Sequence, residues 1–336
     1  MGINPPSKRL SICIPTYNRS KYLDRCLSIL VPQAQKLPND VEIIVSDNCS
    51  NDDTGEVVAR YSQDGLVRYS KNESNIGGCK NIQKCFSTLA EGEFCWVIGD
   101  DDILRDGSIA KVVQIIRDNP DIDYIHVNFI FDTASEETRI QAFQGTLTDP
   151  SKMGMLGIKN LKERKIDQWE DLLADDMFSL NGLYTGISRL ALVRDEFRGI
   201  RIGRDFENIE STYPHTVSYI RKLVGRKAYT TGVPWVICGT KCSWTKFDLV
   251  ARMRSYQLIL YQRQTAIPPL IIDRQLVRFI DRDYSEVIIA LLKSKTYKRD
   301  VAFADEFSLI DLFTELSRFK PFRRLLTNYV KRKMNN

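Results

Sequence analysis

The chain has 336 residues, of which 43% are hydrophobic and 27% are charged, with a formal net charge of +5. These values are ordinary for a soluble globular protein and exclude disordered, collagen-like and mini-protein classes. No apolar run approaches the roughly 20 residues of a membrane-spanning helix. Residues 1–9 also lack the apolar segment of a secretion signal, so we expect the protein to stay in the cytoplasm.

The first 131 residues alternate short apolar runs with segments of helical periodicity. This alternation is typical of an α/β fold with a parallel sheet and right-handed crossovers. A further helix is expected from residue 161. The predicted strands are 10–14, 41–45, 66–69, 94–98 and 124–131, with Pro15 ending the first, and the predicted helices are 22–30, 52–61, 78–89 and 109–116.

Polar residues follow each of the first four predicted strands. The carboxyl ends of parallel strands meet at one edge of a sheet, where ligands bind. Asn, Asp and Ser also cap helices, so polar turns alone are weak evidence for a site. The turns are 15–18 (PTYN), 46–50 (SDNCS), 72–78 (NESNIGG) and 99–102 (GDDD).

Three successive aspartates, Asp100, Asp101 and Asp102, follow the fourth predicted strand. Carboxylates this close repel one another, and they suit a hard cation such as Mg²⁺ or Mn²⁺. Such an ion needs few protein ligands when a diphosphate completes its coordination shell. The alternative is a solvated acidic turn that caps the next helix. The sequence has neither a Gly-x-Gly-x-x-Gly turn nor a Walker motif, which disfavours dinucleotide dehydrogenases and P-loop enzymes.

Eight cysteines are spread along the chain without a Cys-x-x-Cys pair, and the only histidines are His126 and His215. A zinc cluster is therefore not expected. In an intracellular chain, we expect the cysteines to be reduced and to pack as small hydrophobic residues.

The order of these motifs resembles family 2 glycosyltransferases of the GT-A fold. The segments that carry the resemblance are LSICIPTYNR (Leu10–Arg19), VEIIVSDNCSNDDT (Val41–Thr54), NIGGCKN (Asn75–Asn81) and WVIGDDD (Trp96–Asp102). They lie in roughly the first 130 residues. The GDDD form is similar to abequosyltransferase-type enzymes of O-antigen synthesis.

The resemblance implies a nucleotide-sugar-binding and catalytic GT-A domain over residues 1–245, with Mn²⁺ or Mg²⁺ as cofactor. Asp47 would accept a hydrogen bond from the nucleobase. The implied nucleotide-binding residues are Pro15, Thr16, Tyr17, Asn18, Asp47, Asn48, Asn75, Gly77, Lys80, Asp100 and Asp101, and the implied metal residues are Asp100, Asp101, Asp102 and His215. Two alignments of the family's Asp-x-Asp motif stay open, one through Gly99 and Asp101 and the other through Asp100 and Asp102.

In the resembled family the catalytic base is an Asp or Glu from the second half of the domain, and the anomeric centre inverts. Residues 204–215 hold the richest cluster of carboxylates and histidine together in that half. Glu210 is the preferred catalytic candidate, and Asp205 is the second. The alternative for each carboxylate is a solvated helix face, and for His215 a place in the core.

Residues 246–336 are predicted to be helical and to end in a basic amphipathic tail. Residues 317–336 contain seven basic residues and no acidic one, whereas acidic residues slightly outnumber basic ones elsewhere. This pattern favours a peripheral anchor on an anionic membrane surface, with docking on the protein body as the alternative. A nucleic-acid-binding surface on the main domain is not indicated. The apolar stripe of the tail is Phe322, Leu325, Leu326, Tyr329 and Val330.

Together these features predict an inverting glycosyltransferase of surface polysaccharide or O-antigen synthesis. It would move a sugar from a nucleoside-diphosphate sugar to a saccharide acceptor, lipid-linked at the cytoplasmic face of the membrane. Two alternatives stay open. A sugar nucleotidyltransferase would carry a Gly- and Arg-rich loop after the first strand, and a non-catalytic sugar-nucleotide-binding scaffold would not need the aspartate triplet. The donor sugar, base, acceptor, linkage and oligomeric state are not predicted.

Overall fold

The computed structural model describes residues 8–149, 152, 157–158, 160–174, 185–205, 207–239, 255, 258–282, 323 and 327. The chain divides into two units, Met1–Lys246 and Phe247–Asn336, and the candidate site lies in the first. Apart from Arg323 and Thr327, the predicted basic tail lies outside the described residues.

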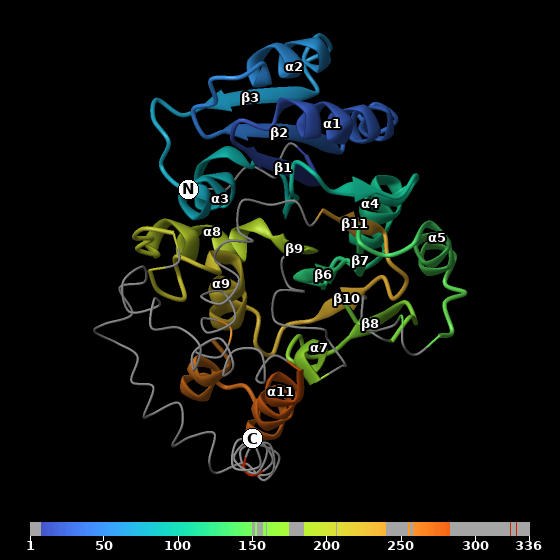
Figure 1. Cartoon of the computed structure of the whole chain (residues 1–336), viewed down its shortest axis with the longest axis vertical. Helices are drawn as coiled ribbons and strands as arrows, with labels where there is room; N and C mark the ends of the chain where they lie inside the picture. Colours follow the sequence, from blue (N-terminus) through green and yellow to red (C-terminus); the bar gives the residue numbers. More distant parts are fainter. Residues whose placement is uncertain are drawn as a thin grey trace, which may run out of the picture. The chain divides into compact units, whose positions relative to one another are not determined.

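An eight-stranded sheet with the order β3-β2-β1-β4-β9-β6-β10-β8 forms the centre of the first unit (Figure 1). Strands β1 to β4 pair in parallel, as do β6 and β10, which agrees with the predicted α/β class. However, β9 runs antiparallel to both β4 and β6, and β8 antiparallel to β10. The strands are β1 (Leu10–Thr16), β2 (Val41–Asp47), β3 (Val67–Lys71), β4 (Phe94–Val97), β6 (Tyr124–His126), β8 (Arg164–Ile166), β9 (Gly186–Arg189) and β10 (Ala228–Thr230).

A second sheet has three strands, β5 (Ile103–Leu104), β11 (Val236–Cys238) and β7 (Phe129–Phe131), in that order. The prediction of one strand over residues 124–131 is wrong, because β6 and β7 belong to different sheets. The fully buried side chain of Asn128 holds the break. Its amide donates to the carbonyl oxygens of Ile158 and Gly232, and its oxygen accepts from the Ile158 amide. Because Asn128 bonds to these two residues, β6 ends before it and β7 begins after it.

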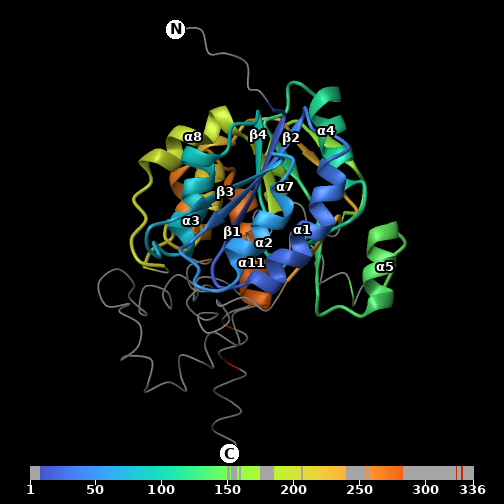
Figure 2. The same cartoon turned by 90° about the horizontal axis from the view of Figure 1, so that it is seen from above.

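Helices cover both faces of the large sheet (Figure 2). On one face lie α1 (Ser20–Ala34), α2 (Thr54–Tyr61) and α4 (Ser108–Asp118), and on the other α3 (Gly78–Lys84), its π-helical continuation η1 (Cys85–Leu89), α8 (Leu190–Gly199) and α9 (Pro214–Lys222). The unit also contains α5 (Glu136–Gln144) and α7 (Asp171–Ala174), and the second unit contains η4 (Gln262–Gln264) and α11 (Pro269–Arg282). The helix expected from residue 161 is wrong, since residues 164–166 form β8. Among the described helices, none is long and apolar enough to cross a membrane.

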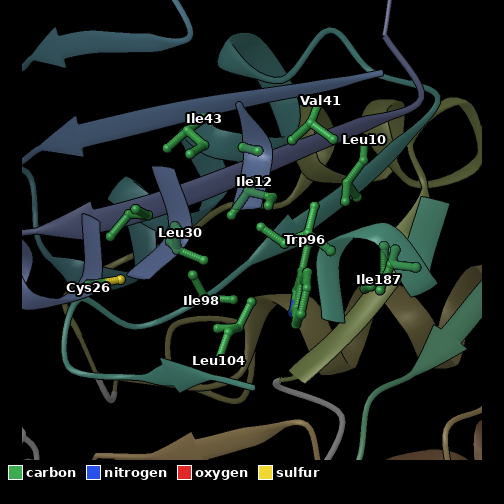
Figure 3. Close-up of a cluster of buried hydrophobic side chains, with 14 of the residues drawn as sticks. Leu10, Ile12, Cys26, Leu30, Val41, Ile43, Trp96, Ile98, Leu104 and Ile187 are labelled. Carbon is green, nitrogen blue, oxygen red and sulfur yellow. The ribbon is translucent and has the colours of Figure 1, made fainter. Parts of the chain in front are cut away.

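The core between the sheet and helices α1 and α4 fixes the strands that carry the candidate site (Figure 3). Leu23, Cys26, Leu27 and Leu30 of α1 are buried at the helical spacing that the sequence predicts. They pack against apolar residues of β1, β2 and β4 in one continuous cluster, which includes Trp96. On the other face, the rings of Phe86 and Phe197 stack with centroids 4.1 Å apart.

Strand β1 continues through Pro15 to Thr16, so the prediction that Pro15 ends it is wrong. The carbonyl of Cys13 accepts from Ile98 on the β4 side, whereas that of Thr16 accepts from Asn48 on the β2 side. By alternation, the backbone of Pro15 faces the β4 side, where β4 has already ended. Its missing N–H group therefore removes no bond from the sheet.

Candidate functional site

The carboxyl ends of β1, β2 and β4 bring three of the predicted polar turns together. The Thr16 hydroxyl donates to Oδ2 of Asp100 at 2.7 Å, which joins the first turn to the aspartate triplet. Asn18 connects the first turn to the second, because its backbone N–H donates to Oγ of Ser50 at 2.8 Å. Asn18 and Cys49 have positive φ angles of 54° and 70°, a conformation that most non-glycine residues avoid.

Asp100 is held by residues on both sides of the first turn. Its Oδ1 accepts from Nε of Arg19 at 2.8 Å, and Nη2 of the same arginine lies 2.7 Å from Oδ2 of Asp101. The Arg19 guanidinium also lies 4.3 Å from the ring centroid of Tyr22. Burial raises the pKa of Asp100 to about 6, although Arg19 favours its ionised form. Arg19 has no predicted role, and the sequence signal for it was a cation three residues after the end of the buried strand β1.

Asp102 fastens the triplet to the segment that follows β11. Its Oδ2 accepts from the Gly99 amide at 2.8 Å and its Oδ1 from the Gly239 amide at 3.1 Å. A Cβ on Gly239 would lie 2.3 Å from Cγ of Asp101, so this position has room only for glycine. Burial, together with the charge of Asp101, raises the pKa of Asp102 to about 7. Through these contacts, Asp102 links the turn at Gly99 to the backbone at Gly239.

The expected metal residues, Asp100, Asp101, Asp102 and His215, do not form one cluster. Within the described ranges, no group of three or more His, Cys, Asp or Glu side chains is arranged to hold a metal ion. Both oxygens of Asp100 and of Asp102 already accept hydrogen bonds. Asp101 differs, since its Oδ2 pairs with Arg19 while its Oδ1 has no hydrogen bond or ion pair in the described part of the chain. The arrangement fits an ion that takes one carboxylate from the chain and its other ligands from a phosphate-bearing molecule and water.

Asp47 is fully buried at the end of β2, with both oxygens engaged. Oδ1 accepts from the Ser50 amide at 2.8 Å and Oδ2 from the Tyr69 hydroxyl at 2.5 Å. Tyr69 is 39% exposed on the edge strand β3, and Tyr17 of the first turn is 42% exposed. Burial and the bond to Asp47 raise the pKa of Tyr69, so its hydroxyl stays protonated and donates. Tyr69 was not predicted as a site residue, because its link to Asp47 depends on the register between β2 and β3.

Asn48 and Asn75, both predicted nucleotide-binding residues, are joined directly. Nδ2 of Asn48 donates to Oδ1 of Asn75 at 2.8 Å, and Oδ1 of Asn48 accepts from Nδ2 of Asn72 at 3.1 Å. The buried amide of Asn81 accepts from Asn72 and donates to the carbonyl of Ser46 on β2. These bonds hold the loop of residues 72–78 against the end of β2.

Asp205, one of the two catalytic candidates, contacts the same loop. Its carboxylate accepts from the backbone amides of Gly78 at 2.9 Å and Cys79 at 3.2 Å, at the start of α3. Gly77 has a φ angle of +92°, and a Cβ there would lie 3.0 Å from Oδ1 of Asp205. The loop therefore needs glycine at the predicted position. Lys80, also predicted, lies half-buried in the first turn of α3.

Glu210, the preferred catalytic candidate, lies in an ion pair. The Glu210 carboxylate is 2.9 Å from Arg221, which also pairs with Glu196 at 2.9 Å. Among the residues that the structure describes, the Glu210 carboxylate forms an ion pair with this arginine alone. His215 is 4% exposed on α9, with its ring centroid 6.3 Å from that of Tyr219. Burial lowers the pKa of His215 to about 3, so the ring is neutral near pH 7. The catalytic and metal-binding roles of these residues stay predictions.

Comparison of the sequence with known proteins identifies relatives. The model of glycosyl transferase family 2 matches residues 11–179, which is half of the chain. Abequosyltransferase RfbV from Salmonella typhimurium is 27% identical over 233 residues. The alignment spans 68% of this chain and 66% of RfbV, so about a third of that relative lies outside it.

Solved structures with the same fold extend over more of the chain. TarS from S. aureus, in complex with UDP-GlcNAc, superimposes with a TM-score of 0.58 at 19% identity, covering 86% of this chain and 77% of that one. Mannosyltransferase PcManGT from Pyrobaculum calidifontis, in complex with GDP-Man and Mn²⁺, gives a TM-score of 0.51 at 15% identity, covering 96% and 85%. The predicted GT-A fold is confirmed.

Proposed function

Because this chain belongs to glycosyl transferase family 2, we propose that it transfers a sugar from a nucleoside-diphosphate sugar to a hydroxyl group of a saccharide acceptor. The observation that carries the proposal is the edge of the large sheet where Asp47, the loop of residues 72–78 and the aspartate triplet meet. The first two can bind a nucleoside, and the third can bind its diphosphate through a divalent metal ion. RfbV is named as a sugar transferase, and TarS and PcManGT were solved with sugar nucleotides, which supports this assignment.

The nucleoside end of the site is built around Asp47. An ionised carboxylate only accepts hydrogen bonds, so the base must present an N–H group to it. Oδ2 of Asp47 already accepts from Tyr69, and a carboxylate oxygen has a second lone pair for such a contact. Tyr17, exposed in the adjoining turn, offers an aromatic face for the base. Asn48 and Asn75 would hold the loop that borders the nucleoside.

The diphosphate end of the site is built around Asp101, the member of the triplet whose Oδ1 has no hydrogen bond or ion pair among the described residues. We assign Asp101 as the ligand of Mn²⁺ or Mg²⁺, while Asp100 and Asp102 hold the turn in place. When bound, such an ion neutralises the charge that develops on the departing diphosphate. A bound Mn²⁺ together with GDP-Man in PcManGT supports this reading.

The proposal for the acceptor is based on the amino-acid sequence. In-line displacement by an acceptor hydroxyl would invert the anomeric centre, with a carboxylate as general base. A lipid-linked saccharide as acceptor, and a peripheral position on the cytoplasmic face of the membrane, would suit the basic tail of residues 317–336. Transfer to such an acceptor belongs to the assembly of a surface polysaccharide such as O-antigen.

A binding screen followed by a turnover assay tests the proposal. Melting curves are recorded with uridine, cytidine, guanosine and thymidine diphosphates and with their sugar derivatives, each with and without Mn²⁺. A ligand at 100 times its Kd should stabilise the protein by about 2.7 kcal/mol. Asp47→Asn, which keeps the shape of the side chain, should abolish the shift. A nucleotidyltransferase would respond to a nucleoside triphosphate and a sugar phosphate instead, and a scaffold would bind a sugar nucleotide without releasing any nucleoside diphosphate.

A further inference from the structure

The guanidinium of Arg19 lies between two carboxylates of the aspartate triplet. Nε is 2.8 Å from Oδ1 of Asp100, and Nη2 is 2.7 Å from Oδ2 of Asp101. The two aspartate side chains are only 7% and 13% exposed, and that of Arg19 is 21% exposed. Adjacent carboxylates with so little access to water need a cation close by, because burying unpaired charges is strongly unfavourable.

Local contacts hold Arg19 in this place. It is the residue that precedes α1, and its guanidinium lies 4.3 Å from the ring centroid of Tyr22 in the first turn of that helix. A guanidinium is planar and donates from several nitrogens in fixed directions, so it can contact two carboxylates at once while stacked on a ring. The arginine is therefore an ordered part of the site, with its charge directed at Asp100 and Asp101.

We propose that Arg19 is a built-in cation that competes with a divalent metal ion for Asp101. While Nη2 pairs with Oδ2, only Oδ1 of Asp101 is left for a metal, and the metal would enter beside an existing positive charge. Repulsion between two cations within a few ångströms is substantial near a protein surface. The chain alone should thus bind a divalent ion weakly, and a ligand that adds negative charge, such as a diphosphate, should be needed for tight binding. This inference rests on the proposed function of the site.

Binding of Mn²⁺ alone tests the inference without an activity assay. Free Mn²⁺ is measured by electron paramagnetic resonance in titrations of the wild type, Arg19→Met and Arg19→Met/Asp101→Asn. Arg19→Met keeps an unbranched apolar side chain over Tyr22 but removes the charge. It should bind one Mn²⁺ at least about tenfold more tightly than the wild type, since 1.4 kcal/mol corresponds to that factor. The double variant should lose this gain.

Two further variants serve as controls. Arg117→Met removes an arginine that pairs with Asp40 at 2.7 Å, and it should leave Mn²⁺ binding unchanged. Arg19→Lys keeps the charge but cannot reach two carboxylates in the same geometry, so its Mn²⁺ affinity should lie between those of the wild type and Arg19→Met. If Arg19→Met fails to give a cooperative melting curve, the comparison of Arg19→Lys with the wild type decides.

Two results would overturn the inference: an Mn²⁺ affinity in both Arg19 variants no higher than in the wild type, or a gain that survives Asp101→Asn. The outcome is separable from that of the proposed function. Failure of every sugar nucleotide to bind or turn over would reject the function while leaving the Mn²⁺ result intact. If the wild type transfers sugar but the Arg19 variants bind Mn²⁺ no more tightly than the wild type, only the inference is rejected.

Discussion

The carboxylate of Asp205 caps the helix that begins at Gly78, 127 residues earlier in the chain. It accepts from the amides of Gly78 and Cys79 and so ties the loop of residues 72–78 to the segment before α9. The bond pattern is that of a positioning residue, since both carboxylate oxygens face backbone amides.

Asp205→Ala should therefore impair donor binding more than turnover. Hydrogen bonds to a charged group contribute about 1.5–3 kcal/mol, so we expect the donor KM to rise roughly tenfold or more and the Tm to fall by several degrees. Asp195→Ala is the control, because Asp195 is 87% exposed in a pair with Arg198. A loss of kcat by three orders of magnitude, with donor KM and Tm unchanged, would instead identify Asp205 as the catalytic base.

Tyr69→Phe should weaken binding of the nucleoside diphosphate through Asp47. The phenol hydroxyl orients Oδ2 of Asp47, and a single hydrogen bond contributes about 0.5–1.5 kcal/mol, so calorimetry should show a loss of roughly two- to tenfold in affinity. Asp47→Asn should lose more, and Tyr69→Phe should then add nothing further, because both act through one contact. Tyr61→Phe is a matched control, since its hydroxyl donates to Asp24 at 2.9 Å in another tyrosine–aspartate pair. Equal losses in the two phenylalanine variants would argue against this role of Tyr69.

Asp101 and Asp102 should respond differently to substitution. Asp101→Asn should remove stimulation of turnover by Mn²⁺ while the melting temperature changes little. Asp102→Ala leaves the amides of Gly99 and Gly239 without their acceptor, and an unsatisfied buried donor costs about 1–3 kcal/mol, so its Tm should fall by several degrees. Turnover with Mn²⁺ and thermal melting are measured for both variants. An Asp102→Ala protein of wild-type Tm that no longer responds to Mn²⁺ would favour the alignment of the motif through Asp100 and Asp102.

His215 should make the protein less stable in acid. Its pKa falls from 6.5 in the unfolded chain to about 3 in the fold, because burial disfavours the charged ring. Between these values the unfolded state binds more protons, so the free energy of unfolding decreases as pH falls below about 6.5. At pH 5 this contribution should amount to about 2 kcal/mol relative to pH 7.5. Urea unfolding of the wild type and His215→Gln at both pH values measures it, and an identical pH dependence in the two proteins would contradict the assignment.

Deletion of residues 320–336 should release the protein from anionic vesicles. Each basic residue near such a surface contributes about 1 kcal/mol, and the attraction should weaken at high salt. Turnover with a water-soluble acceptor analogue should persist, while turnover with a lipid-linked acceptor should fall. Co-sedimentation with anionic and neutral vesicles, beside a melting curve, separates this from a tail docked on the protein. In that second case the deletion would lower Tm and both activities, and the intact protein would not bind vesicles.

Local patterns predict the frame of the site well. Hydrophobic alternation and turn residues place β1, β2 and β4 to within two residues, and the rule for parallel sheets then brings Thr16, Asp47 and Asp100 to one edge. The partners that fix these residues come from distant parts of the chain and leave no local pattern. Tyr69 depends on strand register, and Gly239 approaches Asp102 from 137 residues away. The apolar run of residues 124–131 gave a wrong strand because hydrophobicity alone cannot show that Asn128 finds backbone partners.

The cap on α3 and the bond from Gly239 to Asp102 also set an order in time. A ribosome delivers the chain from its N-terminus, so β1, β2 and β4, whose ends meet at the proposed nucleotide site, are made well before Asp205 and Gly239. Until those two residues have left the exit tunnel, the start of α3 lacks the carboxylate that caps it, and Asp102 lacks one of the two amides that hold it. A nascent chain can therefore pair β1, β2, β3 and β4 while the proposed donor site is still incomplete, and that site is finished only when most of the first unit has been synthesised.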